Sequence, residues 1–448
     1  MVMNRVRSFY ALGVVLGVIA ILVVAMNRHA TQPPASTGSL PGDLAIGEPI
    51  VHENLTVFPV FSRTPRTEDR FITLDEGLAS GKVEILEKGA LARSQPGAQL
   101  AQPQPAANPP AASGGQAQDS QGQLSEVQES AAPGNEVNEL MVVNHSGRPL
   151  YLMPGEIIVG GDQDRTIGSE LVVAPDGKPV PLDVYCVEHG RWGGRNEAEY
   201  ANLSLVIDQS QSGLQSLPGV VTPSDVFVRS ADVQQIVAQA NAGKFVGSVG
   251  SLSKNVRLAV QGAEGQAKVW EEVSSENAKA GVQPQSGAFT ANYADDESAK
   301  RLKPYIDKLQ KPVAETENVV GVIVAVNGKI ESMDVFESSP LFKKLWPKLL
   351  KSHALDAANA RDDKLAAKSC TRNDAAAFLK ETAAASTSKT ETKGDIAVSR
   401  RENERVLLFS AHSGRSNSGE GADASVGDFG GGGFGGSLGG VHAAAFAK

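Results

Sequence analysis

An uncharged stretch near the N-terminus, FYALGVVLGVIAILVVAM, constrains this chain more than any other feature. It runs from Phe9 to Met26, and as a helix of about 18 residues it would reach ~27 Å, close to the ~30 Å of a bilayer's hydrocarbon core. Arg5 and Arg7 precede it, which predicts a cytoplasmic segment 1–8 and an outward-facing remainder. We therefore expect a single-pass membrane anchor with an extracytoplasmic C-terminal part. A cleaved signal peptide, and hence a secreted protein, is the alternative.

Low-complexity segments divide the rest of the chain. Residues 27–43 are typical of a flexible tether, and residues 413–440 form a Gly/Ser-rich loop. Residues 94–135 consist mostly of Gln, Ala, Pro, Ser and Gly, without an apolar period. Such a segment buries too little apolar surface to offset the entropy of ordering, so we expect it to be disordered. Composition leaves open whether it separates two domains or interrupts one.

The remaining segments alternate between strand-like and helical patterns. Turn sequences between short apolar runs predict hairpins over 139–153, over 169–188 and, around Asn327-Gly328, over 319–336. Ala- and Gln-rich helical spacing covers 223–281, and a further helix is expected over 339–359. This order favours an α+β fold, with antiparallel hairpins and a helical middle section, over a doubly wound sheet.

Charge and cysteine content exclude several classes of function. A net charge of −9 argues against nucleic acid as a partner. Neither the seven histidines nor the two cysteines have the spacing of a metal site, and the Gly-Gly sequences lack the context of a phosphate loop, so no metal or cofactor is expected. Cys186 and Cys370 could form a disulfide if the chain is exported.

The sequence YCVEHGRWGG, residues 185–194, gathers several reactive side chains at the end of a predicted strand. Cys186 with His189 as its base would be a nucleophile, but residues three apart on a strand point to opposite faces. The alternative is that Cys186 is a small buried apolar residue. Period two places Glu188 on the same face as Cys186, in a row that begins at Leu182 and Val184. We therefore expect Glu188 to be partly buried and to need a partner.

A second group of polar residues can be read as a site or as a scaffold. It comprises Glu156, Gln163, Arg165, Glu188, Arg191 and Trp192. Arginine offers a fork for carboxylate or phosphate, tryptophan a flat platform, and two carboxylates can serve as acid and base. The same residues could instead form a salt-bridge network that pins two hairpins together. Convergence in an open cleft would favour a site, and burial as mutual pairs would favour the scaffold.

These residues also carry a resemblance to a known family. The chain is similar to the ARPP domain family, type one, associated with the rhodanese-phosphatase superfamily, in the ordered segments NLTVFP, RPLYLMPGEIIVGGDQDRT, VPLDVYCVEHGRW, KVWEEV, GAF and LWPKL. The resemblance implies one domain over 44–447, with 94–135 as an insertion inside it and 413–440 as a loop before a final strand. It maps the family signature onto Gly155, Glu156, Gln163, Arg165, Cys186, Glu188, Gly190, Arg191 and Trp192.

The family has no established reaction or ligand, so the resemblance supplies candidate residues and not a mechanism. Asp162 departs from the pattern, since the family often has a lysine there, and this weakens the case for a phosphate ligand.

Three functional hypotheses follow. In the leading one, Arg165 and Arg191 bind an unknown polar or anionic ligand or protein partner, Glu156 and Glu188 orient them, and Trp192 forms a wall. The alternative is a hydrolytic enzyme in which Glu188 or Glu156 is the general base, with Cys186 nearby. The third is a structural or interaction domain without a small-molecule site.

Overall fold

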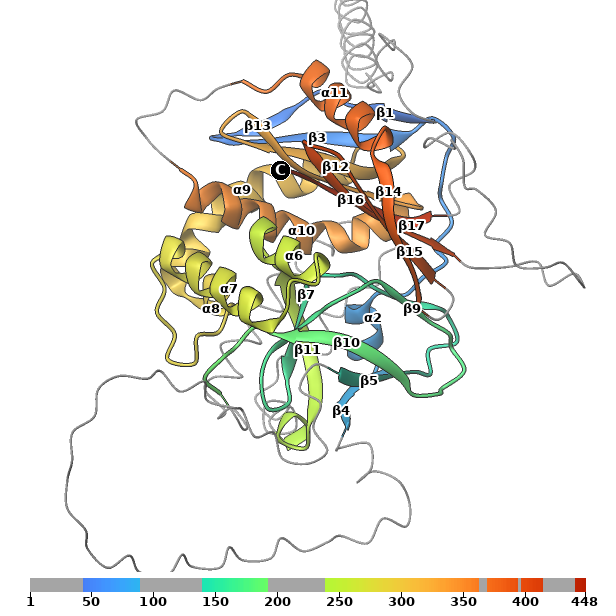
Figure 1. The fold of residues 1–448 in the computed structure, drawn as a ribbon, viewed down its shortest axis with the longest axis vertical. Coiled ribbons are helices and arrows are strands. Elements are labelled where there is room, and N and C mark those ends of the chain that lie inside the picture. Colours follow the sequence, from blue (N-terminus) through green and yellow to red (C-terminus); the bar gives the residue numbers. More distant parts are fainter. Residues whose placement is uncertain (1–42, 89–138, 192–237, 362–368, 394–395, 414–439) are drawn as a thin grey trace, which may run out of the picture. The chain divides into compact units, whose positions relative to one another are not determined.

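The computed structural model describes residues 43–88, 139–191, 238–361, 369–393, 396–413 and 440–448, all of them within the compact unit Pro41–Lys448 (Figure 1). The predicted anchor at 9–26, the insertion at 94–135, most of the loop at 413–440 and Trp192 lie outside these residues. None of the helices in the described ranges is both long enough and apolar enough to cross a membrane.

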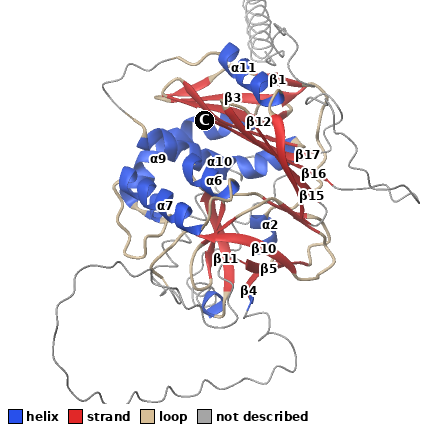
Figure 2. Cartoon of the chain, in the orientation of Figure 1, coloured by secondary structure: helices blue, strands red, loops and turns tan. Residues whose placement is uncertain are grey.

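A nine-stranded antiparallel sheet forms one layer of the unit (Figure 2). Its order is β1-β3-β12-β13-β17-β16-β15-β14, and β2 also pairs with β3. The strands are β1 (Leu44–Ile46), β2 (Ile50–His52), β3 (Leu55–Ser62), β12 (Val319–Val326), β13 (Lys329–Phe336), β14 (Ser386–Lys393), β15 (Ile396–Glu402), β16 (Val406–Ser413) and β17 (Gly440–Ala447).

A second sheet closes into a six-stranded barrel in the order β10-β5-β4-β11-β7-β8. Its strands are β4 (Val83–Glu87), β5 (Glu139–Asn144), β7 (Glu156–Gly160), β8 (Arg165–Ile167), β10 (Val180–Cys186) and β11 (Lys244–Ser251). A separate pair consists of β6 (Leu150–Leu152) and β9 (Leu171–Val173). The strands β4 and β5 pair although the predicted insertion lies between them in sequence, so both of its flanks belong to the barrel.

Helices among the described residues pack against these sheets or against one another. They are α2 (Leu74–Ala79), α6 (Lys254–Gln261), α7 (Gln266–Ala280), α8 (Ala291–Ala294), α9 (Asp296–Ala314), α10 (Ser339–Asn359) and α11 (Arg372–Ala383). The helix α10 contacts β12 of the large sheet and β11 of the barrel, and Figure 1 shows it between these two layers. Because it is covered on several sides, α10 is buried over most of its length, including Trp346 and three lysines. Lys344 and Lys348 pair with carboxylates, whereas Lys351 donates to the carbonyl oxygen of Val249 and burial lowers its pKa to about 7.

The predicted α+β class is confirmed, together with several of its elements. The hairpin β12–β13 turns at Asn327 and Gly328, whose φ values of 51° and 74° are those of the expected turn. The helix over 339–359 is confirmed with Pro347 inside it. Gly281 ends α7 in the left-handed conformation, as expected for a C-cap.

Two predicted hairpins are wrong. The strand β5 pairs with β4 and β10, while β6 pairs with β9, so neither 139–153 nor 169–188 forms a hairpin. The turns do reverse the chain, but β6 and β9 leave the barrel and pair with each other. The Asn144 amide holds the two turns together, because it donates to the carbonyl oxygens of Arg148 and Val173.

The helical prediction for 223–281 is correct for residues 238–241, for α6 and for α7. Residues 223–237 lie outside the described part, and 244–251 form β11, a barrel strand paired with β4 and β7. Register shifts near Gly247 and Gly250 bend this strand. Closure of the barrel therefore outweighs the local helical pattern at this segment.

Candidate functional site

Glu188 and Arg191 form a buried ion pair at the end of β10. Arg191 Nε donates to Glu188 Oε2 over 2.8 Å, and the backbone N–H of Asp164 donates to the same oxygen over 3.0 Å. Arg191 also donates to the carbonyl oxygen of Gly161 over 3.0 Å. Glu188 is 1% exposed, and the period-two burial of Leu182, Val184 and Cys186 holds to the end of β10, after which Val187 and Glu188 are both buried.

Arg165 and Gln163 pair beside this cluster. Arg165 Nη1 donates to Gln163 Oε1 over 3.0 Å, and Nη2 lies 3.8 Å from Glu87 Oε1. Burial raises the pKa of Glu87, against the opposing effect of the Arg165 charge. Gln163 also donates to the carbonyl oxygen of His189. The arginine is 2% exposed, so its guanidinium is directed inside the protein and not toward a cleft.

Glu156 belongs to a different cluster. At the start of β7 it forms an ion pair with Lys348 of α10, whose Nζ lies 2.7 Å from Asp75 Oδ2 of α2. Burial raises the pKa of Glu156, and the Lys348 ammonium opposes this rise. Burial acts against a charged Lys348 as well, but Asp75 and Glu156 raise its pKa above the ordinary value. Ser248 of β11 also donates to Glu156 Oε1, while Glu156 Oε2 is buried without a hydrogen-bond partner.

Cys186 is fully buried, and neither it nor Cys370 forms a disulfide. The Gln266 side chain bonds both the backbone N–H and the carbonyl of Cys186 at 2.8 Å, which secures the strand end. The His189 ring packs edge-on against Trp270 at 4.3 Å. Gln266 thus holds the backbone of Cys186 in place, and Trp270 packs against the ring of His189.

Gly155 and Gly160 complete the structural role of the signature region. A Cβ at Gly155, whose φ is 82°, would lie 2.8 Å from Arg257 Cγ. A Cβ at Gly160, whose φ is 136°, would lie 2.5 Å from the Lys244 carbonyl oxygen. Among the described signature residues, Glu188 and Arg191 form a mutual ion pair, whereas Arg165 contacts Gln163 and Glu87 and Glu156 pairs with Lys348. Trp192 lies outside the described residues.

A second buried network of polar side chains links the loop before β9 and the helix α6 to strands β13 and β17 of the large sheet. His442 of β17 bonds Glu170 through Nδ1 and lies 3.1 Å from Asp334 Oδ1 through Nε2. Arg257 of α6 donates twice to Asp334, over 2.7 and 3.1 Å. Tyr151 donates its hydroxyl to Glu170 Oε1 over 2.7 Å. All five side chains are buried.

In this network the ion pairs affect the pKa values of Asp334 and His442 more strongly than burial does. Burial opposes the charge of Asp334, yet Arg257 and His442 hold the pKa of its carboxyl well below the ordinary value. Burial also opposes a charged His442, but Glu170 and Asp334 raise the pKa of its imidazole. Two basic and two acidic side chains are therefore paired with one another inside the protein.

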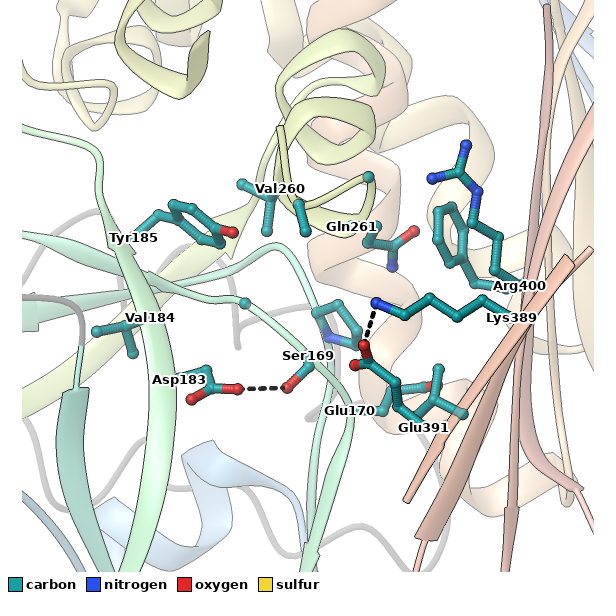
Figure 3. A pocket seen from close by; sticks show the side chains of 16 residues that line it. Ser169, Glu170, Asp183, Val184, Tyr185, Val260, Gln261, Lys389, Glu391 and Arg400 are labelled. Carbon is teal, nitrogen blue, oxygen red and sulfur yellow. Dashed lines mark hydrogen bonds and ion pairs between the residues drawn. The ribbon is translucent and has the colours of Figure 1, made fainter. Parts of the chain in front are cut away.

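Glu170 connects this network to a cavity of about 320 Å³. The cavity lies between the loop that contains Gly168 and Glu170, the end of α6, and the large sheet. Figure 3 shows its walls, with Val184 and Tyr185 from β10, Val260 and Gln261 from α6, and Lys389, Glu391 and Arg400 from β14 and β15. Oε1 of Glu170 accepts both hydrogen bonds of the network, whereas no described residue bonds Oε2.

The sequence interpretation missed this network and cavity. A usable signal is one charged residue inside an otherwise apolar run, as at Arg257 in NVRLAV, Asp334 in ESMDVF and His442 in VHAAAF. Each lies on a different element, so the sequence alone does not bring them together. No group of three or more His, Cys, Asp or Glu side chains in the described ranges is arranged to hold a metal ion.

Comparison with known families identifies the class of domain. Residues 43–211 and 238–416 match the ARPP-1 family, the ARG and Rhodanese-Phosphatase-superfamily-associated Protein domain. The chain belongs to this family, as the resemblance indicated. Arg257, Glu170 and Asp334 lie within the matched residues, whereas His442 lies beyond them. No curated protein and no solved structure matched the chain.

Proposed function

We propose that this ARPP-1 chain is a membrane-anchored protein that binds a small polar ligand in the cavity beside Glu170. The carrying observation is the carboxylate of Glu170, which is 3% exposed, lines the cavity, and has an oxygen without a hydrogen bond from any described residue. Because this oxygen can be reached from the cavity, a ligand that donates to it would gain a hydrogen bond to a carboxylate. The cavity volume lies within the range of small-molecule sites.

The geometry supports this cavity better than the signature cluster as the ligand site. Arg165 and Arg191 already donate to protein acceptors, and a ligand would have to displace Gln163 or Glu188 from them. The hydrolytic alternative is weakened for the same reason, because Glu188 and Glu156 are both buried against cations. We assign these signature residues to positioning β7, β8 and β10.

Blocking the cavity provides a test of ligand binding. Val398 lines the cavity from β15, so Val398→Trp should fill it, whereas Val51→Trp adds the same indole at a side chain that is 52% exposed. In a thermal-shift screen of the full chain against small amines, acids and sugars, we expect at least one compound to raise Tm, because binding to the folded state stabilises it. The shift should disappear in Val398→Trp and persist in Val51→Trp. No stabilising compound, or a shift that survives Val398→Trp, would count against the proposal.

The membrane anchor is proposed from the uncharged segment 9–26. We expect the full chain to stay in the membrane fraction after alkaline carbonate washing, and a variant lacking residues 1–26 to leave it. A C-terminal reporter that folds only after export should be active. A mature N-terminus beyond residue 26, determined by mass spectrometry, would instead establish signal cleavage.

A further inference from the structure

Building on the proposed function, we infer that the cavity beside Glu170 binds a primary ammonium group attached to a compact apolar body. The shared chemistry is that of a free alkyl or aralkyl amine and of a lysine side chain presented by a peptide. The inference rests on which polar atoms of the cavity lack partners, on how its charges are paired, and on its apolar walls.

Three polar atoms around the cavity can accept hydrogen bonds and receive none from the described residues. Glu170 Oε2 is one of them, since both bonds of the network go to Oε1. Gln261 lines the cavity, and its Oε1 has no partner and is closed to solvent in this conformation, so rotation of the side chain would present it to the ligand. The Tyr185 hydroxyl is the third, and Figure 3 shows its ring pointing from β10 toward Val260 and Gln261. An ammonium group supplies three donors and no acceptor, so it fits such a set.

The cavity's own cations already have anionic partners. Lys389 forms an ion pair with Glu391 on the same strand, and Arg400 lies 3.5 Å from Glu402. An anionic ligand would have to displace these carboxylates and would face Glu170. An ammonium instead gains a charge-assisted hydrogen bond to the Glu170 carboxylate.

Aromatic and aliphatic side chains form the rest of the wall. Phe409 and Val260 are buried there, and Tyr185 and Val398 are half-buried. Aromatic faces attract cations, and the apolar side chains favour a hydrocarbon body over a polyhydroxylated one. A volume of about 320 Å³ is near the lower end of ligand pockets, which suits a single ring or a lysine side chain.

Three probes that share one ring and differ in their polar group test this inference. In isothermal titration calorimetry on the full chain, we expect benzylamine to bind, benzyl alcohol to bind about 10-fold more weakly, and benzoate not to bind. A peptide with one central lysine forms the second arm. If this peptide binds more tightly than benzylamine, the natural ligand is a lysine side chain of a protein partner. If benzylamine binds more tightly, the natural ligand is a free amine.

Variants locate the bound amine. Glu170→Gln should weaken the binding of benzylamine by about 10-fold or more. Tyr185→Phe and Gln261→Leu should each weaken it by about 3- to 10-fold. Glu297→Gln is the matched control, because it removes a carboxylate from a side chain that is 78% exposed on α9, and should leave affinity unchanged. If Glu170→Gln fails to fold, Tyr185→Phe and Gln261→Leu decide the question.

The outcomes separate this inference from the proposed function. Tighter binding of benzoate than of benzylamine, abolished by Val398→Trp, would overturn the ammonium assignment and leave the ligand cavity intact. Benzylamine binding that is unchanged in the Tyr185, Gln261 and Glu170 variants would overturn it as well. Failure of all probes, together with no stabilising compound in the thermal screen, would overturn both.

Discussion

Replacing Arg257 with leucine should lower the free energy of unfolding by about 3–5 kcal/mol. The guanidinium makes two hydrogen bonds to Asp334, and neither side chain is more than 1% exposed. Without Arg257, the Asp334 carboxylate would remain in the interior with only His442 to balance it, although His442 also serves Glu170. Urea denaturation followed by circular dichroism measures the loss.

The double variant Arg257→Leu/Asp334→Leu is the control for this prediction. Replacing both partners of a buried ion pair with apolar residues is often close to neutral, so most of the lost stability should return. A single variant that loses less than about 1 kcal/mol, or a double variant as unstable as the single one, would show that Arg257 does not act by neutralising Asp334.

Lys348→Met should also lower the free energy of unfolding by about 3–5 kcal/mol, because it disrupts the buried cluster of Lys348, Glu156 and Asp75. The ammonium is the cation shared by Glu156 and Asp75, and its side chain is 3% exposed. Methionine fills much of the same volume but leaves both carboxylates unpaired. The loss should shrink as the pH falls toward 5, because burial raises the pKa of Glu156 and a protonated carboxyl no longer needs a cation.

A lysine on the surface provides the comparison. Lys300 is 70% exposed on α9 and pairs with Glu297, so Lys300→Met should leave the free energy of unfolding nearly unchanged. Equal losses from Lys300→Met and Lys348→Met, measured as above, would rule out a specific role for the buried cluster. If the loss of stability in Lys348→Met stays constant between pH 7 and 5, the unpaired carboxylate of Glu156 is not its cause.

Local patterns in the sequence predicted the elements that are stabilised locally. The Asn327-Gly328 turn sets its own hairpin, and the alternation through Leu182, Val184 and Cys186 sets one buried face of β10. The barrel could not be read in this way, because β4 pairs with β5 across the predicted insertion and β11 pairs with both β4 and β7. Those pairings depend on closure of the sheet and not on the residues beside each turn.

The cavity beside Glu170 was harder to predict from the sequence than the barrel. The sequence YCVEHGRWGG contains residues that are close together in the chain and chemically varied, and this drew attention to Glu188 and Arg191. In the structure these two neutralise each other. Glu170 and His442, by contrast, are 272 positions apart and meet only because the β17 strand of the large sheet lies against the loop before β9. A single acidic residue at the start of a short strand carries no local signal of such a partner.

A crystal structure of the full chain with a compound that raises its Tm would test the central claim most directly. We predict that the compound lies in the cavity between β10, the end of α6 and β15, with a donor within hydrogen-bond distance of Glu170 Oε2. A compound bound elsewhere on the domain, with the cavity occupied only by water, would contradict the account.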